Sequence, residues 1–538
     1  METKTFLILD IVLGLTALIF TFYCAVRPKK NALLVPALPL AIILVWFLIQ
    51  AFYFFSITVD DSFISLKYAK NFYSGYGLTF NIDTNYPVEG YSNFLWILLI
   101  TPFFSLGGDI LLWVKCISLF LSIISLLLTY LLARKYCGSA TAMLAPLFLV
   151  SFPQFALWTV GGLETPLYIF LILLGFLLLS EVISRKSPVN HPSPIIKKNS
   201  IFLNGFLRFL SLVIVFLAIA LCRFEGIILF FTAAVLLLYN YFSQKPSHPY
   251  RLSSVLLFSF IVLLSYAIYY FWRTEYYHSL LPNMFYAKVH FEISSLIHRV
   301  TDKLELLYLI SPFVVLSLLK CGQSPVKRAY HITILTIVLF ALSCLAYREW
   351  MVGFRYALPA LPFLIILAVR GFSNLITTDN SRYLQRAFII ALLLVTIPQT
   401  SLFGLIQAKK VYANAEQTHQ DIADWLNQYA SPEETLALWD MGLIPYCTNL
   451  KHYYDIHLEG LLESHTNQFG YSAEYFLNQK PDYILLMSTD KNPSQDSLTV
   501  NEVCKLFSMQ DKFWGNYSPV YSMEYAENRF FVLFKLTP

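Results

Sequence analysis

Residues 56–96 read SITVDDSFISLKYAKNFYSGYGLTFNIDTNYPVEGYSNFLW, a polar and aromatic stretch in an otherwise apolar half of the chain. The segment before it is apolar over its whole length, and a helix of about 20 mostly apolar residues spans a bilayer. Of the 538 residues, 57% are hydrophobic and only 13% are charged, whereas a soluble domain carries about 25% charged residues. The sequence therefore predicts a polytopic α-helical membrane protein, with 56–96 as a long loop outside the bilayer.

Twelve apolar segments have the length of transmembrane helices: 5–26, 33–55, 110–133, 140–157, 163–181, 205–222, 225–242, 253–272, 303–319, 330–346, 356–370 and 385–407. A further apolar segment, 92–106, is short and contains Pro102. We predict about 12–13 transmembrane helices, with 92–106 as a surface or re-entrant segment that makes no net crossing. In that arrangement Lys and Arg collect in the loops on one side, which marks that side as cytoplasmic. Loop 56–96 and the C-terminus are then extracytoplasmic, and the predicted location is the bacterial inner membrane.

The polar segment 408–538 is predicted to be a separate small domain on the periplasmic side, following a transmembrane catalytic domain of residues 1–407. Gln417–Tyr429 has apolar residues at helical spacing. Short apolar runs at 435–439, 482–487, 518–524 and 529–535 predict strands, so the domain is expected to be α/β.

The cysteines and histidines of this segment, and the net charge of the whole chain, indicate no further functional site. Cys447 and Cys504 are candidates for a disulfide, and the sequence leaves open whether they pair. The histidines of the polar segment have no metal-ligand spacing and are predicted to lie at the surface: His419, His452, His457 and His465. A net charge of +5 over 538 residues, without a basic arm, argues against a nucleic-acid partner.

Two adjacent aspartates, Asp60 and Asp61, open the long loop directly after a span. A carboxylate pair at the membrane surface must be solvated, paired or bound to a metal. Neighbouring carboxylates also raise one another's pKa, which suits one of them to act as a general base. The pair is thus a candidate catalytic site and a candidate site for a divalent cation such as Mg, Mn or Ca. A plain polar helix end is the alternative.

The loop resembles the first outer loop of GT-C class polytopic glycosyltransferases, in its runs DDSFISLKYAKNFYSGYGLTFN and PVEGYSNFLW. Within that class it is similar to the mycobacterial terminal β-arabinofuranosyltransferases and related bacterial inner-membrane proteins. The resemblance continues in order through GGLETPLY (161–168), CRFEG (222–226), LLPNMFYAK (280–288), REWMVGFRYALPALP (348–362), WDMGLIPYCTN (439–449) and YYDIHLEGLL (453–462). The sequence departs from the family pattern at Phe224 and at Arg348-Glu349-Trp350, which bears on acceptor or sugar preference.

This resemblance implies an inverting glycosyltransferase that moves a sugar, such as the pentose arabinofuranose, from a polyprenyl-phosphate donor to an envelope glycan, glycolipid or glycoprotein. The implied catalytic residues are Asp60 and Asp61. The candidates for substrate binding are Glu89, Tyr91, Asn93, Glu164, Arg223, Glu225, Asn283, Lys288, Arg348 and Arg355. Alternatives stay open for several of them. Arg223 and Glu225 can pair with each other, Glu164 is a favourable first-turn acid, Arg355 can snorkel, and Tyr91 can belong to an interfacial aromatic belt.

Two other functions remain open from the sequence. One is a non-catalytic membrane protein of envelope or motility assembly, in which the Asp pair is structural. The other is a flippase for a lipid-linked glycan, which would place charges at mid-membrane and break spans in paired halves.

Overall fold

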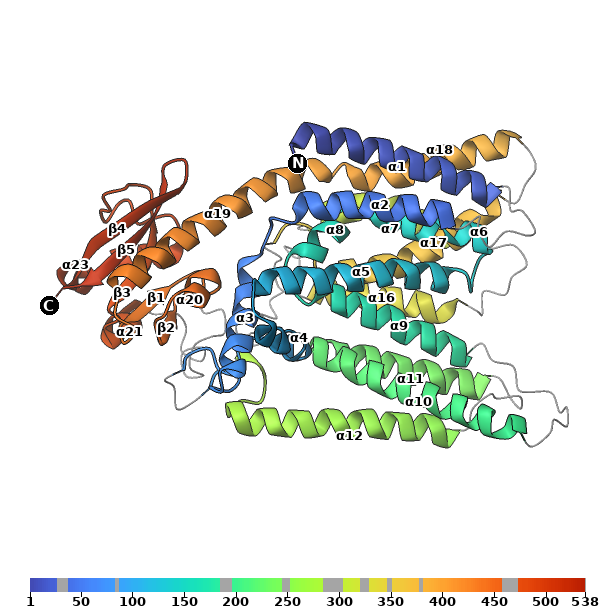
Figure 1. The fold of residues 1–538 in the computed structure, drawn as a ribbon, viewed down its shortest axis with the longest axis horizontal. Coiled ribbons are helices and arrows are strands. Elements are labelled where there is room, and N and C mark those ends of the chain that lie inside the picture. Colours follow the sequence, from blue (N-terminus) through green and yellow to red (C-terminus); the bar gives the residue numbers. More distant parts are fainter. Residues whose placement is uncertain are drawn as a thin grey trace. The chain divides into compact units, whose positions relative to one another are not determined.

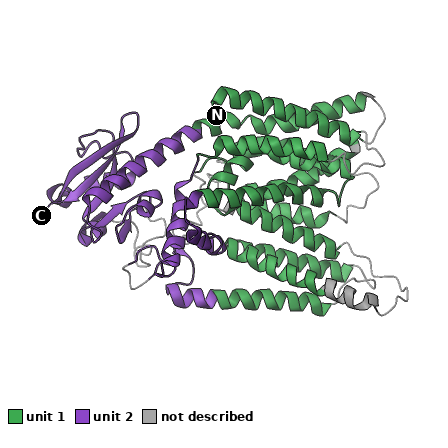
Figure 2. Cartoon of the chain, in the orientation of Figure 1, with its two compact units in different colours: residues 1–56, 112–269, 290–407 green, residues 57–111, 270–289, 408–538 purple. Residues whose placement is uncertain are grey.

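The computed structural model describes residues 1–26, 37–82, 87–183, 196–243, 252–283, 303–319, 329–345, 351–376, 381–456 and 473–537. Two compact units share the chain, shown in green and purple in Figure 2. Unit 1 comprises residues 1–56, 112–269 and 290–407, and unit 2 comprises residues 57–111, 270–289 and 408–538. The expected boundary after residue 407 is one of the boundaries of unit 2. Unit 2 also includes the first polar loop, within residues 57–111, which is distant in sequence from the segment after residue 407.

Unit 1 is a bundle of apolar helices that run roughly parallel to one another (Figure 1). The helices are α1 (Thr3–Val26), α2 (Ala37–Phe54), α5 (Ile110–Ala133), α6 (Ser139–Ala142), α7 (Leu144–Val150), α8 (Pro153–Val160), α9 (Thr165–Ile183), α10 (Ile196–Cys222), α11 (Gly226–Ser243), α12 (Leu252–Tyr277), α15 (Leu304–Leu318), α16 (Tyr330–Leu345), η3 (Leu358–Ala360), α17 (Leu361–Ile376), α18 (Ser381–Gln399) and α19 (Leu402–Tyr429). Helices α5, α12 and α19 continue into unit 2.

A multi-pass membrane protein is confirmed, since seven helices of the described residues are long and apolar enough to span a bilayer. An eighth span arises if Ser139–Val150 and Pro153–Val160, which meet at 64°, are counted together. The chain bends there because Pro153 starts α8 without an N–H to donate to the preceding turn. Every segment predicted to span coincides with a helix or with this bent pair. Four apolar helical segments among the described residues of unit 1 have only 10–17 residues, and each is shorter than any of the seven helices counted as spans.

Helix α1 packs against α2 around a polar group that the sequence analysis did not single out. Asp10 is buried and accepts hydrogen bonds from Trp46 Nε1 at 2.7 Å and Gln50 Nε2 at 2.8 Å. The Trp46 ring lies so close to Gly14 that a Cβ there would be 3.0 Å from it. This carboxyl is thus held by helix packing rather than exposed to lipid.

The C-terminal part of unit 2 is an α/β domain with a five-stranded sheet in the order β2-β1-β3-β5-β4. The strands are β1 (Thr435–Leu438), β2 (His452–Asp455), β3 (Tyr483–Ser488), β4 (Tyr517–Ala526) and β5 (Arg529–Leu536). The sheet is mixed, because β1 pairs in parallel with β2 and β3, whereas β5 pairs antiparallel with β3 and β4. The helices are α20 (Leu443–Cys447), α21 (Ala473–Gln479), α22 (Glu502–Ser508) and α23 (Asp511–Asn516). The four predicted strands are confirmed, and β2 was not predicted.

Cys447 and Cys504 do not form the disulfide that the sequence left open. Phe507, Phe513 and Phe534 are fully buried in the core of this domain, and Cys504 packs among them as a free thiol. Cys447 is also a free thiol, at the end of α20.

The rest of unit 2 is built from the first polar loop and the residues after α12. It contains α3 (Asp60–Tyr73), α4 (Phe94–Ile100) and the 3₁₀ helix η1 (Thr101–Leu106). Helix α3 packs against α4, η1 and α20. Helix α4 and η1 together are too short for the roughly 20 residues of a span, in keeping with the interpretation of 92–106 as a non-crossing segment.

Candidate active site

The first residue of α3 reaches the start of α20 in the C-terminal domain. Val59 is extended, with φ −83° and ψ 136°, and α3 begins at Asp60. The Asp60 carboxylate accepts hydrogen bonds from the backbone N–H groups of Gly442 and Leu443, both at 2.9 Å. These N–H groups at the start of α20 have no partner within a helix. One side chain of the polar loop therefore satisfies a helix start that is 382 residues away.

Gly442 is required at this contact because the space that its side chain would occupy is filled. A Cβ at position 442 would lie 2.1 Å from the Asp60 carbonyl oxygen and 2.4 Å from its Cγ and Oδ2. No real Cβ approaches so closely. The close approach of Asp60 is therefore the reason that the WDMG run has a glycine, which lacks a Cβ, at position 442.

His419 of α19 lies between two carboxylates. Its Nδ1 is 3.5 Å from Asp60 Oδ1, and its Nε2 is 3.3 Å from Asp440 Oδ2, with 6% of the side chain exposed. The prediction that His419 lies at the surface is therefore wrong. A signal was present, since His419 precedes the buried Ile422 and Leu426 of the predicted helix by three and seven residues, which places all three on one face.

The two carboxylates keep His419 protonated. Burial alone would lower the pKa of His419, but Asp440 and Asp60 outweigh it and raise the pKa to about 10. His419 lies beyond the apolar part of the last span, in a stretch of α19 that also carries Lys409, Lys410 and Asp421. Carboxylates within 3.5 Å of both ring nitrogens favour the doubly protonated imidazolium.

Asp60 is correspondingly held as a carboxylate. Burial would raise its pKa, but His419 and the N–H groups of Leu443 and Gly442 lower it below the usual value. Asp61 follows in the first turn and is partly exposed, and its side chain leaves the helix about 100° away from that of Asp60.

The described residues hold no preformed site for the predicted divalent cation, which stays a prediction. None of them forms a group of three or more His, Cys, Asp or Glu placed to hold a metal ion. Both Asp60 oxygens already face N–H donors, Gly442 at Oδ2 and Leu443 at Oδ1. A cation would have to displace these donors.

Two lysines of α3 fasten the same helix to α20. Lys67 is buried and donates to the carbonyl oxygen of Pro445 at 2.8 Å, and Lys70 donates to that of Tyr446 at 3.3 Å. Burial, and secondarily Lys70, lowers the pKa of Lys67 to about 7. Asn81 adds a two-way pairing with the backbone of Tyr453 in β2, at 3.1 and 3.0 Å. The polar loop and the C-terminal domain are therefore one folded body.

The PVEGYSN run closes the polar loop through buried partners. Glu89 pairs with Arg273 of α12 at 2.6 Å, and each side chain is 4% exposed. Burial raises the pKa of Glu89, against the opposing effect of Arg273. The Tyr91 hydroxyl lies 2.9 Å from that of Tyr277. Asn93 donates from Nδ2 to Ser65 Oγ at 2.9 Å.

A second polar cluster lies in unit 1, around Glu164 at the start of α9. Glu164 Oε1 is 2.5 Å from Arg355 Nη2 and 3.3 Å from Arg223 Nε. Glu164 and both arginine side chains are at most 8% exposed. Arg223 Nε is also 3.2 Å from Glu225 Oε1, and Glu225 is 32% exposed. The structure thus brings together four residues that the sequence singled out in three separate motifs.

Aromatic rings surround the two guanidinium groups of this cluster. Arg223 lies over Tyr168 and Tyr356, with 5.2 and 4.9 Å to the ring centroids. Arg355 lies 5.8 Å from the Trp158 ring centroid. Such faces attract cations, and guanidinium groups present several N–H donors to a phosphate or carboxylate.

Some predicted residues contribute to neither cluster. Asn283 is buried near the end of the described part of its loop. Lys288, Arg348, His457 and His465 lie outside the described residues.

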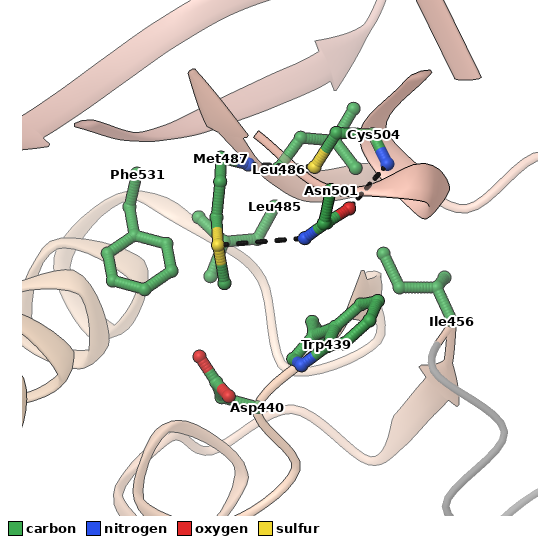
Figure 3. Close-up of a pocket in the computed structure, with 9 residues that line it drawn as sticks. All are labelled: Trp439, Asp440, Ile456, Leu485, Leu486, Met487, Asn501, Cys504 and Phe531. Carbon is green, nitrogen blue, oxygen red and sulfur yellow. Dashed lines mark hydrogen bonds between the residues drawn. The ribbon is translucent and has the colours of Figure 1, made fainter. Parts of the chain in front are cut away.

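A hollow in the C-terminal domain adjoins Asp440, at the carboxyl ends of β1 and β3. Figure 3 shows Trp439, Met487, Asn501 and Phe531 around it. Its empty space is about 240 Å³, including the part open to solvent, and ligand sites usually need about 300–1,000 Å³. The hollow by itself is therefore small for a sugar.

Comparisons with known proteins agree with this architecture. A family model described as a domain of unknown function, DUF8728, matches residues 408–533. Among curated proteins none matches the sequence. ArnT from Cupriavidus metallidurans bound to undecaprenyl phosphate is similar with a TM-score of 0.59 and 12% identity, over 92% of this chain and 97% of that chain. Its apo state gives a TM-score of 0.56 at 13% identity, over 91% and 97%.

The apo oligosaccharyltransferase of Archaeoglobus fulgidus is similar with a TM-score of 0.51 and 10% identity, over 90% of this chain and 70% of that chain. ArnT and this oligosaccharyltransferase are GT-C glycosyltransferases. At these identities the likeness shows the fold, so the chain has the GT-C fold that its motifs predicted. The narrower resemblance to arabinofuranosyltransferases stays a prediction.

Proposed function

We propose that this protein is an inverting glycosyltransferase that moves a sugar from a polyprenyl-phosphate donor to an acceptor hydroxyl of the cell envelope. The observation that carries the proposal is the shared fold with ArnT bound to undecaprenyl phosphate, over 92% of this chain. We place the reaction at the outer face of the bacterial inner membrane, on the distribution of Lys and Arg. A pentose such as arabinofuranose is the proposed sugar, on the resemblance of the first-loop motif.

The donor phosphate is assigned to the cluster of unit 1. Arg223 and Arg355 face a single buried carboxylate, Glu164, and guanidinium groups bind phosphate through paired N–H donors. In the reaction the acceptor oxygen attacks the anomeric carbon while the bond from that carbon to the phosphate oxygen breaks. The arginines offset the charge that remains on the departing polyprenyl phosphate.

The proton of the acceptor hydroxyl is assigned to the carboxylates that open α3. Transfer of this proton raises the nucleophilicity of the acceptor oxygen as it attacks. Glu89, Tyr91 and Asn93 act by holding the loop, because their polar groups pair with Arg273, Tyr277 and Ser65.

The test uses the full-length protein in lipid nanodiscs and a panel of short-chain polyprenyl-phosphate sugars. Release of polyprenyl phosphate from one sugar donor is expected, and Arg355→Gln should weaken donor binding. Asp61→Asn should reduce turnover with little change in binding. Lys512→Gln, at an exposed surface pair of the C-terminal domain, is the matched control and should behave as wild type.

Two results would contradict the proposal. An intact protein that neither binds nor cleaves any donor would favour a non-catalytic role in envelope or motility assembly. Movement of an uncleaved donor between leaflets of a liposome, unaffected by Asp61→Asn, would favour a flippase.

A further inference from the structure

The C-terminal domain contributes a charged side chain directly to the aspartate pair. His419 lies 3.5 Å from Asp60, and Gly442 and Leu443 donate to the same carboxylate. All three belong to the segment after residue 408, which the sequence presents as a separate polar region. The start of α3 therefore contacts that segment at two elements, α19 and the start of α20.

The charged groups that face the His419 ring come from two elements. Asp60 approaches from α3, and Asp440 approaches from the turn after β1. The ring of Phe531 in β5 covers the imidazole, with 5.3 Å between centroids. A histidine in this setting is a buried cation held between two partly exposed carboxylates.

Asp60 is a weak base in such a setting. A base must be able to take up a proton, and each N–H donor on a carboxylate favours the unprotonated form. Two backbone N–H groups donate to the Asp60 carboxylate, and the imidazolium of His419 forms an ion pair with it at 3.5 Å. Asp61 leaves the same helical turn in another direction.

We propose that His419 is a positioning residue, which fixes Asp60 against the C-terminal domain so that Asp61 takes the acceptor proton. This inference rests on the proposed glycosyl transfer. It assigns different tasks to the two aspartates. Asp60 orients the start of α3, and Asp61 is the catalytic residue that touches the substrate. It also makes the C-terminal domain a necessary part of the reaction centre.

The test compares variants of the full-length protein in nanodiscs by two independent measurements. Hydrogen exchange of peptides that cover 57–75 and 439–448 reports whether α3 and α20 stay together. Release of polyprenyl phosphate reports turnover. In His419→Gln we expect exchange in both peptides to rise about tenfold or more, as for loss of a hydrogen bond to a charged group. We also expect kcat to fall while the KM of the donor changes little.

His452→Gln is the matched control, because His452 belongs to the same domain but lies in β2. It should leave both measurements as in wild type. Asp60→Asn should resemble His419→Gln, with faster exchange and residual turnover. Asp61→Asn should keep wild-type exchange and lose about 10²-fold or more in kcat, as for removal of a general base.

The outcomes separate this inference from the proposed function. Wild-type exchange and turnover in His419→Gln would overturn the positioning role. Complete loss of turnover in Asp60→Asn with wild-type exchange would make Asp60 the base and overturn the division of tasks. If exchange responds as expected but the wild-type protein transfers no sugar, the proposed function fails and the catalytic role given to Asp61 fails with it.

Discussion

Replacing Gly442 by alanine is expected to detach the start of α3 from α20. The added Cβ would lie 2.1 Å from the Asp60 carbonyl oxygen and 2.4 Å from its carboxylate. Close carbon–oxygen contacts are about 3.3 Å, so the two segments must separate by about 1 Å. The hydrogen bonds from Gly442 and Leu443, now 2.9 Å, would then exceed the range of a hydrogen bond.

The free-energy cost follows from the two bonds that would be lost. A hydrogen bond to a charged group contributes about 1.5–3 kcal/mol, and 22% of the Asp60 side chain is exposed, which favours the low end. At the low end of that range, two such bonds amount to about 3–4 kcal/mol. Each 1.4 kcal/mol is a factor of ten in an opening equilibrium, so local opening should rise by about 100- to 1,000-fold.

Hydrogen exchange of the full-length protein in nanodiscs measures this opening. Exchange should accelerate in peptides from α3 and α20 and stay unchanged in those from unit 1. Gly515→Ala is the control, because a Cβ at this glycine of α23 meets no heavy atom within 4 Å. Equal protection of α3 and α20 in wild type, Gly442→Ala and Gly515→Ala would show that Asp60 does not dock on Gly442.

Three further predictions concern buried charges, each tested by thermal unfolding of the full-length protein. Glu164→Ala leaves two buried arginines without their shared carboxylate and should destabilise unit 1 by about 3–5 kcal/mol. Glu89→Ala should destabilise unit 2 in the same way, because it leaves Arg273 buried without its carboxylate. The control Glu474→Ala, at an exposed pair, should cost less than about 1 kcal/mol. Similar losses of stability in Glu89→Ala and Glu474→Ala would contradict the role given to the buried pair. Burial lowers the pKa of Lys67 to about 7, so between pH 7 and about 10 the unfolded chain binds more protons and stability should rise with pH. Lys67→Met should remove this rise, and an unchanged pH profile would refute it.

Local patterns were sufficient to predict the membrane half of the fold. A span is specified by the length and hydropathy of one segment, and both can be read without knowing its neighbours. Segment 110–133, for example, coincides with α5 at both ends. The strand β2 was missed because HYYD is short and polar at both ends, and its place is fixed by pairing with β1 rather than by its own pattern.

The grouping of the site residues depended on contacts that single-sequence patterns do not contain. Asp60 and Gly442 lie 382 residues apart, and neither the aspartate pair nor the WDMG run indicates the other. His419 was assigned by residue type and the absence of ligand spacing, although its helical register already placed it on the buried face with Ile422. Periodicity was the better guide there than side-chain polarity.

The two clusters differ in the charge that they present, and this difference supports the proposed division of the reaction. Around Glu164, two buried arginines face the buried carboxylate of Glu164 and the more exposed carboxylate of Glu225, so positive and negative charges balance there. Around His419, one imidazolium faces Asp60 and Asp440, with Asp61 adjacent, which leaves an excess of negative charge. Negative charge favours uptake of a proton and repels phosphate. If the phosphate instead bound beside Asp61, removing the negative charge of Asp61 would tighten donor binding. Under the present assignment, Asp61→Asn lowers turnover and leaves donor affinity within about twofold of wild type. That change is well below the tenfold that corresponds to 1.4 kcal/mol.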